Sequence, residues 1–221
     1  MPKKDGLVRD IYYIDGKPYT KYEVERLQSI LNPYSSVDKK MLKILKEVSG
    51  ALTRIRHCVV GRAAVALYGR PLLVDDIEFL IDVSGVEGHT LMNSLRKIEV
   101  SEDSLKHLIN GNKVTIEKPS WVYRVVLIPA TDEAQIMHLK GAMKTTILGL
   151  ELYLIPPEDL IACSISHANI EDAAYLLTNL EIDDERLSLI SRVLGVEKDV
   201  WELVEKVHQL KVNLRKQANK Q

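Results

Sequence analysis

Two acidic side chains, Asp76 and Glu78, stand at alternate positions of the apolar segment DIEFLIDV. Alternate residues of a β-strand point to the same side, so both carboxylates should share one face while Ile77 and Phe79 take the other. Hard divalent cations prefer such oxygen ligands, and a cation held beside phosphates can support phosphoryl or nucleotidyl transfer. The pair therefore predicts a metal-binding and catalytic site at Asp76 and Glu78.

A glycine stands upstream of this strand, where the apolar run HCVV gives way to the segment GRAAVALYGR. Gly61 allows a sharp turn from a strand into a helix, and the unpaired N–H groups of a helix start attract anions. Arg62 follows directly, and Arg70 ends the segment. We therefore expect phosphate or cofactor binding at Gly61, Arg62 and Arg70. A structural role is the alternative, in which Asp76 and Glu78 bond to helix N-termini or pair with the two arginines.

The elements that position these residues mix strands and helices from His57 onward. Periodicity and turn residues predict strands in the segments HCVV, DIEFLIDV, KVTIEK, VYRVVLIP and TTILGLELYLI, the last broken at Gly149. Helices are expected between them, including one over residues 132–143. After the pair Pro156–Pro157 the pattern is helical to the C-terminus. The fold class is therefore predicted as α+β, a small mixed β-sheet flanked by helices with a helical C-terminal part.

These changes of pattern divide the chain into three segments. Residues 1–50 form an N-terminal extension, residues 51–156 the core with the acidic pair, and residues 157–221 a helical C-terminal region. Within the extension, a hairpin is expected over residues 7–20 and a helix over residues 20–31.

Composition narrows the class of protein. Lys and Arg number 30 against 31 Asp and Glu, so overall charge gives no reason to expect a nucleic-acid or membrane partner. No apolar stretch approaches the ~18 residues of a membrane helix, and the N-terminal residues do not form a secretory signal, so we expect a cytoplasmic protein.

Cys58 and Cys163 lie in apolar segments and are interpreted as buried free thiols. The histidines, among them His138 and His167, show no metal-ligand spacing and are interpreted as core or surface residues.

The stretch VVGRAAVALYGRPLLVDDIEFLID resembles the core of the DNA-polymerase-β-like nucleotidyltransferase superfamily. It is most similar to the AbiEii toxin and minimal nucleotidyltransferase type, which connects the chain with toxin–antitoxin proteins. In that type an apolar strand, Gly-Gly or Gly-Ser, an AVALHGR-like helix and the motif (T/S)xDIDLLV follow one another. The later stretch LELYLIPPEDLIACSISHANIEDAAYLL is similar to the family's strand, its PEDLIALKL helix and its KDxxDLxxLL helix. The resemblance spans residues 55–180.

The resemblance places Gly61 at the first motif glycine, and Asp76 and Glu78 at the first two metal carboxylates. In that family these acids bind Mg²⁺ ions that hold the triphosphate of an NTP, and NMP passes to an acceptor hydroxyl. The resemblance therefore implies a nucleoside triphosphate as substrate, Mg²⁺ as cofactor and an RNA, protein or small-molecule acceptor. It implies no membrane partner, and it leaves a homodimer open.

Three departures from the family pattern indicate a degenerate metal site. Arg62 occupies a position that is small in the family, and Glu78 stands where Asp is commoner. The third carboxylate belongs at about Val126, on a strand face without acids, and Glu117 on the preceding strand is the candidate substitute. Two functions remain open: a nucleotidyltransferase-like protein that binds NTP–Mg²⁺ and transfers NMP, or an inactive module of that fold in nucleotide sensing or protein interaction.

Overall fold

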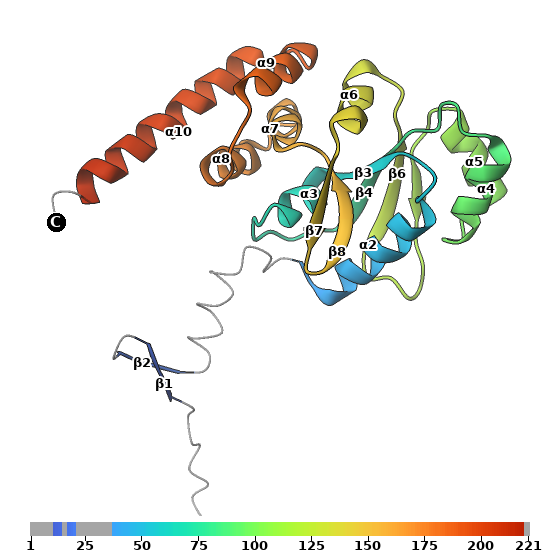
Figure 1. Ribbon diagram of the computed structural model, residues 1–221, viewed down its shortest axis with the longest axis horizontal. Coiled ribbons are helices and arrows are strands. Elements are labelled where there is room, and N and C mark those ends of the chain that lie inside the picture. Colours follow the sequence, from blue (N-terminus) through green and yellow to red (C-terminus); the bar gives the residue numbers. More distant parts are fainter. Residues whose placement is uncertain (1–10, 15–16, 21–36, 219–221) are drawn as a thin grey trace, which may run out of the picture.

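The computed structural model describes residues 11–14, 17–20 and 37–218 of the chain (Figure 1). Its strands are Ile11–Ile14 (β1), Lys17–Thr20 (β2), His57–Val60 (β3), Asp76–Ile81 (β4), Val114–Ile116 (β5), Arg124–Pro129 (β6), Met143–Ile147 (β7) and Leu150–Leu154 (β8). Its helices are Lys39–Ala51 (α2), Gly61–Leu67 (α3), Gly88–Arg96 (α4), Glu102–Ile109 (α5), Glu133–Gly141 (α6), Pro157–Ser166 (α7), Ile170–Asn179 (α8), Asp184–Val193 (α9) and Glu197–Ala218 (α10).

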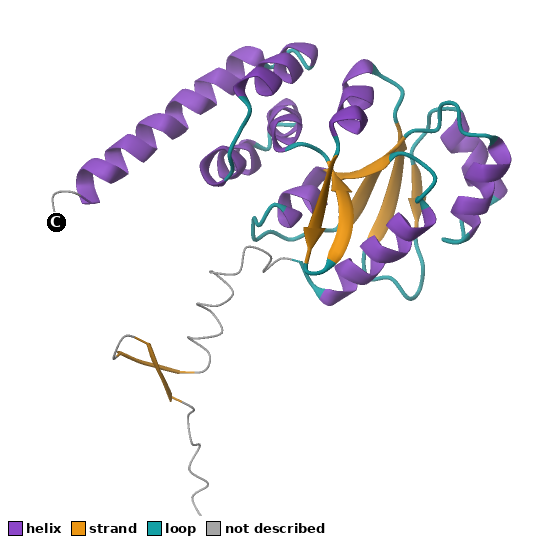
Figure 2. Ribbon diagram, viewed as in Figure 1, coloured by secondary structure: helices purple, strands orange, loops and turns teal. Residues whose placement is uncertain are grey.

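The described strands form a six-stranded mixed sheet in the order β5-β6-β4-β3-β8-β7, and a separate antiparallel pair of β1 and β2. Strand β3 is antiparallel to β4 and parallel to β8, while β4 and β6 are parallel. Helices flank the sheet and continue alone after its last strand (Figure 2). The α+β fold with a mixed sheet and a helical C-terminal part, predicted from the sequence, is confirmed.

The central strands bury one face of the sheet completely. Five side chains on neighbouring positions of these strands have no exposed surface: Val59, Ile77, Phe79, Val125 and Leu127. The strand register places these side chains next to one another across the sheet, because residue 59 pairs with 79 and residue 79 pairs with 127. Burial of a side chain of this size contributes roughly 1.5–3 kcal/mol, so this face fixes how the three strands align.

Helix α2 begins at an N-cap and covers the sheet near β8. The carboxylate of Asp38 accepts a hydrogen bond from the Met41 N–H at 2.6 Å, which satisfies one of the free donors of the first turn. Met41, Leu45 and Val48 recur at helical spacing and are fully buried, so this apolar stripe holds the helix on the sheet. Helices α4 and α5 lie along the β5–β6 edge (Figure 1).

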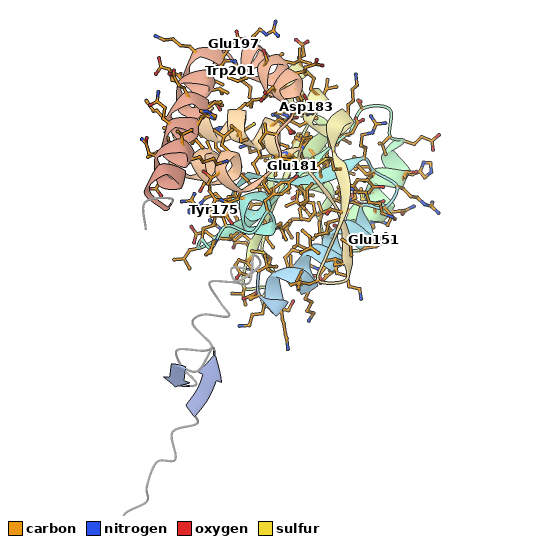
Figure 3. The ribbon with its side chains drawn as sticks, turned by 60° about the vertical axis from the view of Figure 1, so that its left-hand side comes forward. Glu151, Tyr175, Glu181, Asp183, Glu197 and Trp201 are labelled. Atoms are coloured by element: carbon orange, nitrogen blue, oxygen red, sulfur yellow. The ribbon has the colours of Figure 1, made fainter. Side chains whose placement is uncertain are left out.

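Helices α3, α6 and α7 cover the part of the sheet that carries Glu78. Helices α3 and α6 contact β4, and α7 contacts α3. Helix α7 begins with Pro157, which suits a first helical position because the residue there needs no N–H donor. Helices α8, α9 and α10 pack around α7, and the Tyr175 hydroxyl of α8 donates to the Gly69 carbonyl at 2.8 Å. Figure 3 labels Tyr175 and Trp201 on this helical part and Glu151 on β8.

One prediction about a helix boundary is wrong. The helix expected over residues 132–143 ends at Gly141, because Met143 already belongs to β7 and pairs with Leu154 of β8. Pairing across the sheet therefore overrides the helical pattern at that point. The turn of the expected N-terminal hairpin and the helix over residues 20–31 lie outside the described residues.

The division into residues 1–50, 51–156 and 157–221 stays a prediction. One continuous apolar cluster includes Met41 of α2, Phe79 of β4 and Val200 of α10. Within the described part of the chain, no helix combines the length and the apolar character that a membrane crossing requires.

Candidate functional site

Gly61 joins β3 to α3 through a backbone conformation that favours glycine. Its φ is +63°, in the left-handed region where a Cβ atom costs roughly 1–2 kcal/mol. The Oε2 atom of Glu78 also occupies the place that a Cβ atom at residue 61 would take. The register explains this approach, since Val60 pairs with Glu78 across β3 and β4. Glycine is therefore required here by both the turn and the carboxylate that lies against it.

Asp76 and Glu78 stand two residues apart on β4 and face the same side. Ile77 and Phe79, which alternate with them, are fully buried on the opposite face. Asp76 lies at the start of the strand, 3.8 Å from the guanidinium of Arg124 on β6. Because Asp76 retains 37% of its side-chain exposure and Arg124 retains 54%, this ion pair is weak and can open for a ligand.

Glu78 is the more shielded of the two acids. Burial raises the pKa of its carboxyl group above the ordinary value, and the neighbouring negative charge of Asp76 raises it further. Lys113 and His167 act in the opposite direction and lower the pKa. Glu78 is thus a carboxylate whose charge is poorly compensated, and a bound cation would supply the missing compensation.

The row of residues across the sheet at Glu78 contains no second acid. Val126 of β6 pairs with Glu78, and Thr115 of β5 pairs with Val126 on the other side. An apolar side chain therefore lies beside Glu78 at the position where the resemblance leads us to expect a third carboxylate. Among the described residues, no group of three or more histidines, cysteines and acids is arranged to hold a metal ion.

Arg62 and Arg70, expected at the phosphates, both approach Asp172 of α8. Asp172 is 4% exposed, and its carboxylate forms an ion pair with Arg70 and lies 4.0 Å from Arg62. Arg70 also pairs with Glu171 at 3.0 Å. Arg70 thus connects the α3–β4 segment with the helical part of the chain. Arg62 keeps 52% of its side-chain exposure and can still reach a ligand.

A cavity of about 540 Å³ opens beside Gly61 and Glu78. Strands β3 and β4 and helices α3, α6 and α7 contribute its walls. Arg62, Lys113 and His167 bring basic side chains to the same cavity. Three of the predicted site residues, Gly61, Arg62 and Glu78, are therefore brought together at one cavity, whereas Asp76 and Arg70 do not line it.

Two residues of the cavity wall, His138 and Cys163, belong to a polar network that sequence reasoning missed. His138 of α6 lies 3.4 Å from the Cys163 sulfur and 2.8 Å from the Asp159 carboxylate, both on α7. Arg186 of α9 donates two hydrogen bonds to Asp159, each 2.7 Å long. Each of these contacts between two helices joins residues that are 21 or more positions apart in the sequence. No local spacing could therefore have revealed the network.

A larger cavity lies elsewhere. It measures about 990 Å³ and is bounded by α2, the β7–β8 edge and the end of α6. Lys46, Arg54, Arg56 and Lys140 line it, together with His57. Burial lowers the pKa of the His57 ring. None of the site residues predicted from the sequence lines this cavity, so its size alone does not make it the functional site.

Comparisons with known proteins give distant structural similarity. No protein-family model matches the chain, and no curated protein matches it. The structure of ANT(2")-Ia in complex with adenylyl-2"-tobramycin is similar with a TM-score of 0.43 and 14% identity, over 71% of this chain and 98% of that one. An antigenic nucleotidyltransferase-like protein from Paracoccidioides brasiliensis is similar with a TM-score of 0.44 and 15% identity, over 77% of this chain and 94% of that one. Similarity at this level does not transfer a substrate or an activity to this chain.

Proposed function

We propose that this chain is a nucleotidyltransferase-like protein that binds a nucleoside triphosphate with one Mg²⁺ ion and has lost efficient NMP transfer. One observation carries the proposal: Asp76 and Glu78 share a face of β4, but the next strand offers Val126 beside them. Two acids at this position suffice to hold the metal of a nucleotide. They leave the reaction without its third acid.

The residues present fit one metal ion better than two. Mg²⁺ in nucleotide sites is usually bound through one or two carboxylates, with phosphates and water completing its six ligands. Asp76 and Glu78 can supply those carboxylates once the Asp76–Arg124 pair, at 3.8 Å, has opened. A site with two metal ions needs further shared oxygen ligands, and the described residues contain no cluster of three such groups. When bound, the ion would neutralise and orient phosphate oxygens.

Binding requires the Glu78 carboxylate to leave Gly61. In its present rotamer, the carboxylate fills the space above the glycine that a phosphate would need. A metal ion beside Asp76 would draw the Glu78 carboxylate toward itself. Its positive charge would offset both the repulsion from Asp76 and the cost of burying the negative charge of Glu78. Rotation of this one side chain would therefore create the metal site and free the glycine turn together.

Basic residues of the cavity suit a triphosphate. Arg62 and Lys113 lie at its wall with His167, and all three can balance negative charge on the ligand. A cavity of about 540 Å³ lies within the roughly 300–1,000 Å³ range of small-molecule sites. The chemistry therefore matches a compact polyanion that carries its own divalent cation.

Transfer of NMP needs more than this binding. The acceptor hydroxyl must lose a proton as it attacks, and a positioned base contributes roughly 10²–10⁴-fold to such a step. Val126 cannot take that role, and Glu117 is an exposed residue beyond the end of β5. We therefore favour nucleotide sensing or a nucleotide-dependent protein interaction over transfer to RNA, protein or a small molecule.

Titration calorimetry with Mg·ATP and Mg·CTP tests the binding proposal. We expect wild-type protein to bind at least one of them, and Asp76→Asn or Glu78→Gln to weaken binding tenfold or more. Asp75→Asn is the matched control, because Asp75 is an exposed acid directly before β4 and should leave binding unchanged. The proposal is wrong if wild-type protein does not bind, or if the control weakens binding as much as the two site variants.

Incubation with radiolabelled NTP, Mg²⁺ or Mn²⁺ and total cellular RNA or lysate tests the loss of transfer. We expect the wild-type protein to put no more metal-dependent label on RNA, protein or small molecules than the Asp76→Asn variant does. Reproducible labelling by wild-type protein that disappears in Asp76→Asn would show instead that the chain is an active nucleotidyltransferase.

A further inference from the structure

Cys163 and His138 face each other at the cavity wall. Cys163 lies on α7 and His138 on α6, and the Sγ and Nε2 atoms are 3.4 Å apart. Both side chains line the cavity of about 540 Å³, so a ligand there can reach the sulfur. A thiol within hydrogen-bond reach of an imidazole, whose other nitrogen is held by a third group, is the arrangement of an activated nucleophile.

The partners of His138 determine which of its nitrogens carries the proton. The Nδ1 atom lies 2.8 Å from Oδ2 of Asp159, and this carboxylate also receives two hydrogen bonds from Arg186. A carboxylate that is ion-paired with arginine is ionised and only accepts hydrogen bonds, so Nδ1 must be the donor. In the neutral ring, the Nε2 atom that faces Cys163 then carries the lone pair and can accept the thiol proton. This is the tautomer that a general base requires.

The chain contains an internal comparison for this arrangement. Cys58 has 0% exposure, whereas Cys163 is partly exposed and lines the cavity. Burial raises the pKa of both thiols to about 12. Both are therefore protonated at rest, and attack by either sulfur requires a group that removes the proton. Only Cys163 has such a group, since His138 is its hydrogen-bond partner.

From this geometry we propose that Cys163 is a nucleophile for small activated acyl groups, such as esters and thioesters, with His138 as its general base. Asp159 is a positioning residue that holds the histidine in the productive tautomer. The site is separate in chemistry from the proposed nucleotide site, although both open into one cavity. It does not depend on metal or nucleotide binding.

The step balances without a further reactant. The Cys163 sulfur attacks the acyl carbonyl carbon as its proton passes to Nε2 of His138, and a sulfur–carbon bond forms. The bond from that carbon to the leaving oxygen or sulfur breaks, and His138 returns the proton to the departing alcohol or thiol. The products are S-acyl Cys163 and the free alcohol or thiol, with no change of oxidation state.

A purely structural role for the network makes a different prediction. The hydrogen bonds of His138, Asp159 and Arg186 join α6, α7 and α9 and would stabilise the helical part in any case. In such a role, the rate at which the Cys163 sulfur reacts depends on how exposed the sulfur is and not on His138. The rate of acyl transfer to the sulfur, measured in folded protein, therefore separates the two roles.

Acetylation by 4-nitrophenyl acetate, followed by peptide mass spectrometry, tests the proposal in the full-length protein. We expect one acetyl group on Cys163 and none on Cys58. His138→Gln should slow acetylation of Cys163 tenfold or more, in line with the roughly 10²–10⁴-fold effect of a positioned base. Cys163→Ala should abolish the labelling, and circular dichroism shows whether each variant is folded.

Three results would overturn the proposal. One is wild-type protein in which Cys163 is acetylated no faster than Cys58. Another is a folded His138→Gln variant that retains more than a tenth of the wild-type rate. The third needs no variant: equal acetylation rates of wild-type protein in H₂O and D₂O would show that no proton moves during the attack, whereas we expect a slower rate in D₂O.

Discussion

Two carboxylates, Asp159 of α7 and Glu78 of β4, differ in how the protein holds them: Glu78 lines the cavity, whereas Asp159 is buried and contacts the cavity residue His138. Asp159 has no exposed surface, and Arg186 and His138 together give it three hydrogen bonds of 2.7–2.8 Å. Glu78 is partly exposed, and within the described residues it has no ion-pair partner. Burial raises the pKa of Glu78, and the like charge of Asp76 raises it further.

The difference separates an acid that stabilises the fold from one that is available to a ligand. A buried charge without partners would cost several kcal/mol, so Asp159 is tolerable only because its partners are fixed on neighbouring helices. Glu78 has no such fixed partner and lies against the Gly61 backbone instead. An acid with uncompensated charge beside a cavity is therefore a better candidate for cation binding than a more deeply buried one.

Removal of the Asp159 charge should have the largest effect on stability. Asp159→Asn leaves the Arg186 guanidinium without its charged partner and replaces one of the two acceptor oxygens between Arg186 and His138 with an NH2 donor. Loss of one partner of a buried pair typically costs about 3–5 kcal/mol, and we expect a decrease of that order in the free energy of unfolding. Urea denaturation followed by circular dichroism measures it.

The matched variant for this experiment is Glu78→Gln. It removes the charge of a cavity-lining carboxylate without breaking an ion pair among the described residues, so the free energy of unfolding should change by less than about 1 kcal/mol. Equal losses in Asp159→Asn and Glu78→Gln would show that the two acids do not differ in the way their partners indicate.

A substitution at the glycine turn should have an intermediate effect. Gly61→Ala places a Cβ atom at a φ of +63° and against the Glu78 carboxylate. The backbone alone should cost about 1–2 kcal/mol, and displacement of the carboxylate adds to it. In a Glu78→Ala background that second contribution disappears. A double-mutant cycle from urea denaturation should therefore give a coupling of about 0.5–3 kcal/mol, and additive losses would contradict the contact.

Much of the strand–turn–helix–strand segment could be predicted from sequence because its signals are local. An apolar run that ends at Gly61 indicates a turn, and a period of two places Asp76 and Glu78 on one face of a strand. The loss of a third metal carboxylate at about Val126 stays a prediction. The structure adds only that the register of β4 and β6 pairs Val126 with Glu78.

The rest of the site depends on contacts between distant segments. Arg70 pairs with an acid on α8, and His138 meets Cys163 only because the fold brings α6 beside α7. No residue spacing encodes such a contact, because it depends on how the helices dock on the sheet. The rotamer of Glu78 that closes the glycine turn is likewise set by tertiary packing, so sequence could predict the acid but not its place against Gly61.

The pH dependence of stability should give the smallest but most direct measure of the state of Glu78. Its folded-state pKa is raised from the ordinary value of 4.5 by burial and by Asp76, so the folded protein binds more protons there than the unfolded chain. Its contribution to stability is therefore fully present below pH 4.5 and is lost as pH rises through the raised pKa. Urea denaturation at a series of pH values should show wild-type protein losing stability relative to Glu78→Gln over that window. Addition of Mg·ATP at the upper end of the window should reverse the loss, because a cation compensates the charge. A difference between the two proteins that stays constant with pH would show that Glu78 ionises freely in the folded state.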